Sequence, residues 1–354
     1  MIRRVGTAAV AGVAAVAAGL AVRAAGSRAV DRLLVAPRTT PDEGSLTTAL
    51  DDLGGEVVRL RSRDGVRLAA RWLPAAAIPD DEWTVDPHEA TVLLHGYTGS
   101  VAPDLVEYGP FLRRTTNVLG LDFRGHGDSD DGPTTFGLLE VEDVAGALAW
   151  LGERGVSRVA LFGTSMGGIV ALASVAVLGD GTLASADIAP DEPRHVEAAP
   201  RPRIVAVVAE SVPPELVVPI ASRLRGPASR FVAGRLFDGA SARLGADPRA
   251  TEPARVIGLV EPVPLLLIHG ADDATVPAAD GARLAALAGP SAEHWVVSGA
   301  DHAGAHRAAA GPSEQRVTAF LRTAVLAARN GQPILGTPGA PAGDRSNDAI
   351  LVED

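Results

Sequence analysis

One serine in this chain is placed as a nucleophile would be. Ser165 lies in the stretch LFGTSMGG, residues 161–168, between apolar runs over 156–162 and 169–177. An apolar run, a glycine-flanked turn and a second apolar run predict a strand, a sharp turn and a helix. Such a turn would hold Ser165 in a strained backbone conformation above a sheet, at the N-terminus of the helix.

A serine hydroxyl becomes a nucleophile only beside a base, and the base needs an acid to fix its tautomer. Two later apolar runs end in residues of these types. LLLIHGADDATVP offers Asp272 and Asp273, and VVSGADHAGAH offers His302, with His306 as a more distant second base. The order serine, aspartate, histidine is the one that a G-x-S-x-G turn in a parallel sheet requires.

Acyl transfer to a serine also requires donors for the oxyanion. In LLHGYTG, Gly96 directly follows a predicted strand and lets the backbone turn, so that the amide of Tyr97 can point into the cleft. The amide of Met166 would be the second donor, because the first N–H groups of a helix lack partners and favour negative charge. The sequence therefore predicts Tyr97 and Met166 as the oxyanion hole.

The other histidines have simpler interpretations. His95 and His269 each precede a strand-end glycine, and we interpret both as structural residues that hold loops. His126 and Asp128 in RGHGD shape a turn, and with no third ligand placed nearby we expect no metal site. The glycines of that stretch are not a phosphate loop, because the basic residues of the chain are all arginine.

Composition excludes several classes of protein. The 354 residues, 47% of them hydrophobic, are enough for one large domain or two small ones. The absence of cysteine excludes disulfides, thiolate nucleophiles, iron–sulfur clusters and cysteine zinc sites. A net charge of -11 argues against nucleic acid as a partner.

Apolar strands and amphipathic helices alternate from residue 56. A hairpin is predicted over 56–74, followed by strands over 91–96, 118–123, 159–163, 204–210, 263–270 and 294–299. Helices are predicted over 138–155, 166–178, 278–288 and 314–329. This alternation indicates an α/β fold with a mostly parallel sheet covered on both faces.

Several segments interrupt this pattern. Residues 212–262 contain helical patches between two strands and are predicted to form a small cap inserted in a domain spanning 39–330. Residues 180–203 are predicted to be a mobile surface loop, 39–55 a polar spacer, and 331–354 a disordered tail.

The first 38 residues form a segment of their own. Val5 to Val22 is free of charge and just long enough to span a bilayer. An uncleaved membrane anchor, a cleaved signal peptide of a secreted protein, and an Ala-rich helix lying on the domain all fit. We favour the anchor, because the predicted fold is complete without this segment. We therefore expect residues 1–30 to lie outside the catalytic domain, and the domain to fold without residues 1–38.

Four blocks of the chain resemble the α/β-hydrolase superfamily, in its serine-nucleophile branch. They are HGYTGS (95–100), LDFRGHGDSD (121–130), GTSMGG (163–168) and HGADDATVP (269–277) with GADHAG (299–304). The small N-terminally anchored esterase and peptidase-like hydrolases look nearest. The resemblance covers about residues 56–330 and implies Ser165 as nucleophile, His302 as base and Asp273 as acid, with Tyr97 and Met166 as oxyanion amides and no cofactor.

The expected reaction is hydrolysis of a carboxylic ester through an acyl-enzyme. A thioesterase, a lipase or a peptidase would use the same residues, whereas a dehalogenase would have aspartate in place of Ser165. A membrane-tethered binding protein that has lost catalysis is the alternative from another class, and its signature would be a broken triad. The acyl and alcohol groups of the substrate are not encoded in a readable motif.

Overall fold

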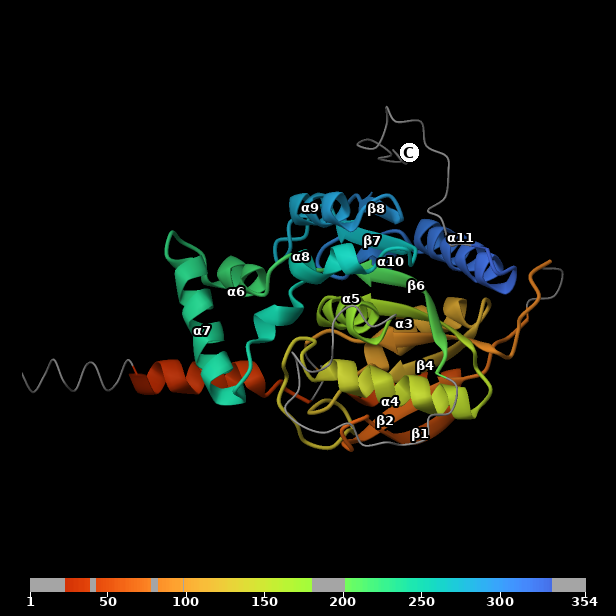
Figure 1. The fold of residues 1–354 in the computed structure, drawn as a ribbon, viewed down its shortest axis with the longest axis horizontal. Helices are drawn as coiled ribbons and strands as arrows, with labels where there is room; N and C mark the ends of the chain where they lie inside the picture. The colour runs from red at the N-terminus through yellow and green to blue at the C-terminus, as the bar shows by residue number, and fades with distance from the viewer. Residues whose placement is uncertain (1–22, 39–42, 78–81, 98, 180–200, 333–354) are drawn as a thin grey trace, which may run out of the picture.

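The computed structural model describes residues 23–38, 43–77, 82–97, 99–179 and 201–332. Eight strands form one sheet, in the order β1-β2-β4-β3-β5-β6-β7-β8 (Figure 1). The hairpin β1–β2 and the β2–β4 pair are antiparallel, and all other pairs are parallel, which confirms the predicted mostly parallel sheet. The strands are β1 (Glu56–Arg61), β2 (Arg67–Leu73), β3 (Glu89–Leu94), β4 (Asn117–Leu121), β5 (Arg158–Thr164), β6 (Arg203–Glu210), β7 (Leu265–Gly270) and β8 (Ala292–Val297).

Helices cover both faces of the sheet, and the central strands are therefore almost continuously apolar. On one face α3 and α11 pack with one hydrophobic cluster, and on the other α4, α5 and α9 pack with a second. The main helices are α2 (Glu43–Leu53), α3 (Ala102–Leu112), α4 (Glu140–Glu153), α5 (Met166–Leu178), α9 (Ala278–Ala288), α10 (Ala305–Ala308) and α11 (Ala310–Arg329).

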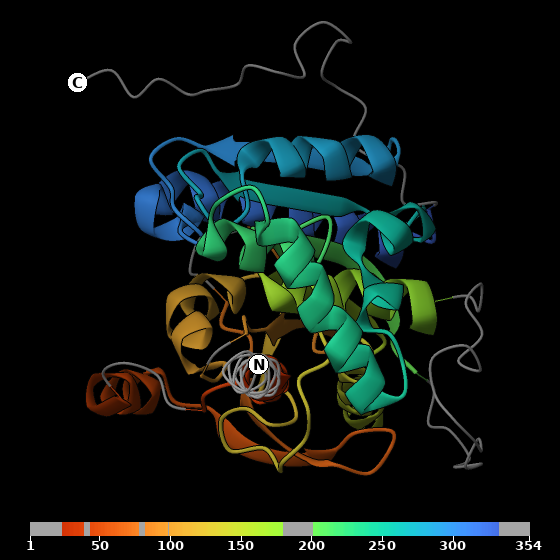
Figure 2. The same cartoon turned by 90° about the vertical axis from the view of Figure 1, so that its left-hand side faces the viewer.

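The chain between β6 and β7 is helical, as predicted for the cap. It contains α6 (Val217–Leu224) and α7 (Ser229–Leu244), followed by the short turns η2 (Pro248–Thr251), α8 (Pro253–Val256) and η3 (Ile257–Leu259). In Figure 1 α6 and α7 stand off one end of the sheet, while α8 lies closer to α5, and Figure 2 views the molecule from that end.

Residues 23–34 form a helix that crosses α7 (Figure 1). Val30 and Leu34 pack against Ala240 of α7, and the Asp31 carboxylate pairs with Arg243. The predicted anchor over 5–22, most of the predicted loop and nearly all of the predicted tail lie outside the described residues. Within the part of the chain that the structure describes, no helix has the length and apolarity needed to cross a bilayer.

Two helices differ from the sequence prediction. The stretch predicted as a polar spacer contains α2, whose Leu50 and Leu53 pack on the α3 side of the core, while Arg71 donates to the Leu50 carbonyl oxygen. Helix α3 was not predicted, because Pro110 lies within it and proline usually interrupts a helix.

Candidate active site

The turn between β5 and α5 has the strained geometry expected of a nucleophile elbow. Ser165 has φ 49° and ψ −109°, a conformation that residues other than glycine rarely adopt. Gly163 and Gly167 flank this turn, and both must be glycine because other backbone atoms lie too close to leave room for a side chain. A Cβ atom on Gly167 would lie 1.9 Å from the carbonyl oxygen of Leu94, and one on Gly163 would lie 2.3 Å from the backbone of Gly167.

The structure brings the predicted serine, histidine and aspartate together from three separate strand ends. His302 follows β8, and its Nε2 atom lies 3.0 Å from Oγ of Ser165. On the other side of the ring, Nδ1 lies 2.8 Å from Oδ2 of Asp273, which follows β7. With the neutral ring protonated at Nδ1, the Ser165 hydroxyl donates to Nε2, the arrangement that general-base catalysis requires.

Asp273, and not Asp272, faces the imidazole. The Asp273 side chain is buried, and its Oδ1 accepts hydrogen bonds from the amides of Thr275 and Val276, each 2.8 Å long. Burial alone would raise the pKa of Asp273, but the hydrogen bonds from His302 and these amides outweigh burial and lower it. Asp272 is exposed to solvent. The acid is thus held ionised beside the ring.

The alternative base, His306, points elsewhere. Its two ring nitrogens lie 3.4 Å from a Glu107 oxygen and 3.3 Å from a Glu314 oxygen, and its ring stacks on Phe111. The structure therefore does not bring His306 to Ser165.

The loop after β3 presents the first predicted oxyanion donor. His95 is buried, and its Nε2 accepts a hydrogen bond from the amide of Phe123, so the proton is on Nδ1, 2.7 Å from the Gly96 carbonyl oxygen. Burial lowers the pKa of His95 to about 3, which keeps the ring neutral. In a trans peptide the amide of Tyr97 points away from the Gly96 oxygen. His95 thereby orients the Tyr97 donor.

Tyr97 is also held at its carbonyl and at its side chain. The Tyr97 carbonyl oxygen lies 2.9 Å from Nε2 of His126. The phenol donates to the carbonyl oxygens of Arg32 at 2.8 Å and Leu33 at 3.0 Å, and the ring stacks on Phe136. Met166 is the first residue of α5, so its amide has no partner within the helix.

Residues 32–38 follow the rim of the site, whereas the favoured sequence interpretation placed residues 1–38 outside the domain. The Pro37 carbonyl oxygen accepts a hydrogen bond from the amide of Gly99, and the Leu34 carbonyl oxygen accepts one from Thr134, both 2.8 Å long. The guanidinium of Arg38 donates to the carbonyl oxygens of Gly127 and Ser129 at 2.8 and 2.7 Å and pairs with Asp131. We call residues 32–38 the strap.

Glu210, at the end of β6, is a further residue that the sequence reasoning missed. Its carbonyl oxygen accepts a hydrogen bond from the amide of Ser165, and its buried carboxylate accepts hydrogen bonds from the amide of Ala305 and the phenol of Tyr108. Glu210 thus links the nucleophile elbow to the loop that carries His302. The signal was present in IVAVVAE, where an acid ends an otherwise apolar strand.

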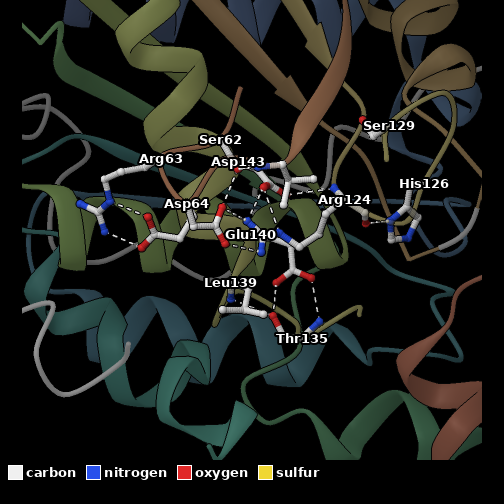
Figure 3. Close-up of polar contacts among 12 residues, drawn as sticks. Ser62, Arg63, Asp64, Arg124, His126, Ser129, Thr135, Leu139, Glu140 and Asp143 are labelled. Carbon is white, nitrogen blue, oxygen red and sulfur yellow. Dashed lines mark hydrogen bonds and ion pairs between the residues drawn. The ribbon is translucent and has the colours of Figure 1, made fainter. Parts of the chain in front are cut away.

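The LDFRGHGDSD block forms a polar network beside the oxyanion loop after β3. Asp122 accepts hydrogen bonds from the amides of Val101 and Asp128, which orders the turn. Arg124 binds both Asp64 and Asp143, as Figure 3 shows. Among the described residues there is no cluster of three His, Cys, Asp or Glu side chains that could hold a metal ion.

An eight-stranded, mostly parallel sheet with serine, aspartate and histidine at its strand ends is the architecture of an α/β hydrolase. Comparison with known proteins agrees with this class. The model of the alpha/beta hydrolase family matches residues 91–311, and the chain belongs to that family. YfhR of Escherichia coli O157:H7, described as uncharacterized, is 28% identical over 242 residues, which are 67% of this chain and 70% of the relative.

Solved structures show the same fold. The esterase Pf2001 of Pyrococcus furiosus matches with a TM-score of 0.60 and 21% identity, over 82% of this chain and 97% of the esterase. The alpha/beta hydrolase GrgF from a Penicillium species matches with a TM-score of 0.52 and 18% identity, over 77% and 100%. At such low identity the structural match shows the fold alone, and it confirms the predicted α/β-hydrolase architecture.

Proposed function

We propose that this protein is a serine hydrolase that cleaves carboxylic esters through an acyl-enzyme intermediate. The observation that carries the proposal is the continuous hydrogen-bonded chain from Ser165 through His302 to Asp273, at 3.0 and 2.8 Å. The intact triad argues against a binding protein that has lost catalysis. The fold shared with an esterase is in keeping with the proposal.

The proposed reaction has two halves. Nε2 of His302 takes the proton of Ser165 as Oγ attacks the acyl carbon, and the amides of Tyr97 and Met166 bind the oxyanion. One such donor contributes about 3–4 kcal/mol to stabilisation of the transition state. His302 then gives its proton to the leaving alcohol, which departs and leaves the acyl group on Oγ. In the second half His302 deprotonates a water molecule, and the hydroxide attacks the acyl carbon. The bond from the acyl carbon to Oγ then breaks, His302 returns its proton to Oγ, and the carboxylic acid leaves.

A row of aromatic rings joins the oxyanion loop to the cap. Tyr97 stacks on Phe136, and Phe136 packs edge-on against Phe237 of the cap helix α7. Thioesters and peptides would react by the same steps, so measured turnover of each substrate class has to distinguish them.

The test is a panel of p-nitrophenyl esters of increasing chain length, with Ser165→Ala and Ser174→Ala as paired variants. Ser174 is buried farther along α5 and serves as the control. Ser165→Ala should lower kcat by at least about a thousandfold, while Ser174→Ala should change it little. A fluorophosphonate probe should label the parent and not Ser165→Ala. Turnover retained by Ser165→Ala, or a parent that takes no label, would contradict the proposal.

A further inference from the structure

The outer end of the cap carries exposed apolar side chains. Leu224 ends α6, and Phe231 and Val232 lie in the first turn of α7. They are 48%, 71% and 42% exposed. A phenylalanine so exposed, with two aliphatic neighbours, is the kind of apolar patch that marks an interaction site.

Arginines flank these residues along the chain, although the chain as a whole is acidic, with a net charge of -11. Residues 217–244 contain five arginines, and Asp238 is their one acidic residue. Within the part of the chain that the structure describes, neither Arg223 nor Arg225 has a carboxylate partner. Arg230 is paired with Glu215. The cap end therefore combines apolar side chains with two unneutralised cations.

The N-terminal helix reaches the cap on the same side. Val232 lies four, seven and eleven residues before Leu236, Gly239 and Arg243, so these four residues share one side of α7. That side contacts the helix of residues 23–34 through Val30 and Asp31. Residues 23–28 of this helix are exposed and lead away from the sheet (Figure 1). The sequence immediately before them is the uncharged run 5–22.

We propose that the cap end, formed by Leu224, Phe231 and Val232 with Arg223 and Arg225, docks on an anionic lipid bilayer. Aromatic and aliphatic side chains enter the interface between headgroups and acyl chains, while arginines bind lipid phosphates. A basic apolar patch is one membrane signal, and the uncharged run that precedes residue 23 in the sequence is a second. A second copy of the chain fits less well, because a two-fold contact would bring the arginines of both copies together.

Docking in this way would place the catalytic loops near the lipid surface. The Ser222 hydroxyl, two residues before Leu224, lies 3.1 Å from the Thr275 carbonyl oxygen, and the amide of Thr275 binds Asp273. The lipid-facing end of α6 is therefore in direct contact with the loop that carries the acid of the triad.

The absence of cysteine makes a site-specific test possible in the full chain. Phe231→Cys and Val57→Cys each give one attachment point for the fluorophore NBD, and exposed Val57 on β1 serves as the control. On vesicles of phosphatidylcholine with phosphatidylglycerol, NBD at position 231 should shift to the blue and be quenched by spin-labelled lipid, whereas NBD at 57 should not. Equal responses at the two positions, or no response, would overturn the proposal. A shift that needs no vesicles and grows with protein concentration would instead indicate self-association and would also overturn it.

Charge reversal tests the arginines separately. Arg225→Glu should weaken partitioning into phosphatidylglycerol vesicles about fivefold or more, since each arginine near an anionic surface contributes on that scale. Arg203→Glu, at the start of β6 and exposed, is the matched control and should leave partitioning unchanged. The difference should shrink at high salt. Equal partitioning of the two variants, with thermal unfolding unchanged in both, would contradict the role of the arginine.

Discussion

Asp272 and Asp273 are adjacent in sequence and occupy opposite environments. The amide of Asp272 binds the Ala300 carbonyl oxygen, which turns the Asp272 side chain to solvent, whereas Asp273 is directed inward to His302. Two backbone amides and the imidazole stabilise the Asp273 carboxylate, so burial does not neutralise it. The acid is therefore selected by the turn after β7 and not by residue type.

This difference gives a prediction with its own control. Asp273→Asn should lower kcat about ten-thousandfold, because an amide can donate to Nδ1 of His302 and favour the wrong tautomer. Asp272→Asn should leave kcat close to that of the parent, since its side chain is exposed. Steady-state kinetics on one p-nitrophenyl ester measures both variants. A large loss in Asp272→Asn with none in Asp273→Asn would reverse the assignment of the acid.

The sequence located the site residues that belong to short motifs. Ser165, His302 and the Asp272–Asp273 pair each follow a predicted strand, so their approximate meeting point follows from the parallel sheet. The partners of Tyr97 could not be found in this way, because Arg32 and Leu33 contact it through backbone carbonyls, and any residue type supplies a carbonyl. The side chains of Arg32 and Leu33 therefore do not indicate this contact.

At the scale of elements, the elbow depends on how closely α5 approaches the end of β3. No side chain fits at Gly167, where a Cβ atom would lie 1.9 Å from the Leu94 carbonyl oxygen. Gly167→Ala should therefore destabilise the fold or displace Ser165, with loss of ester turnover. Gly234→Ala, in α7 with no atom within 4 Å of the added Cβ, is the control and should stabilise by up to about 1 kcal/mol. Urea unfolding with parallel activity assays measures both. An unchanged Gly167→Ala would show that the elbow can relax.

The strap is the element whose role the structure revises most. Residues 32–38 form hydrogen bonds to the oxyanion loop and to the turn after β4, so we no longer expect removal of residues 1–38 to leave an intact site. Tyr97→Phe keeps the ring on Phe136 but removes both phenol hydrogen bonds. It should lower stability by about 1 kcal/mol and reduce kcat more than it changes KM, because the displaced group is an oxyanion donor.

Two truncations provide the complementary test of the strap. A chain lacking residues 1–22 should keep its ester turnover, whereas one lacking residues 1–38 should lose most of it or fail to fold. Equal turnover in the two truncations would mean that the strap contacts are dispensable.

Secondary structure was predictable where a periodic apolar pattern is long, as in α4, α5 and α9. Helix α2 was missed although its stretch GSLTTALDDL carries the signal, because Leu46, Ala49, Leu50 and Leu53 recur at the spacing of an amphipathic helix. Leu50 and Leu53 pack on the α3 side of the core, as that spacing predicts.

Across the whole molecule, one buried arginine joins parts that are distant in sequence. Arg124, in the turn after β4, binds Asp64 of the β1–β2 hairpin with both Nη atoms at 2.8 Å, and binds Asp143 of α4 at 2.7 Å (Figure 3). Arg124 is 3% exposed at its side chain, and Asp143 is completely buried. The network therefore fixes the antiparallel edge of the sheet to α4 and to the turn that holds His126.

Removal of this arginine should destabilise the whole fold. In Arg124→Ala, Asp143 would keep its hydrogen bond from the amide of residue 124 but lose the guanidinium. Burial raises the pKa of Asp143 to about 7 even beside Arg124, so above this pH the variant would hold a buried carboxylate without its counter-charge. Breaking a buried pair in this way costs about 3–5 kcal/mol. Arg67→Ala is the matched control, because the pair between Arg67 and Asp130 is exposed and such pairs contribute about 1 kcal/mol or less. Chemical unfolding of both variants measures the difference. Equal unfolding free energies would mean that Asp143 is protonated or solvated in the variant and that α4 is held by its apolar face alone.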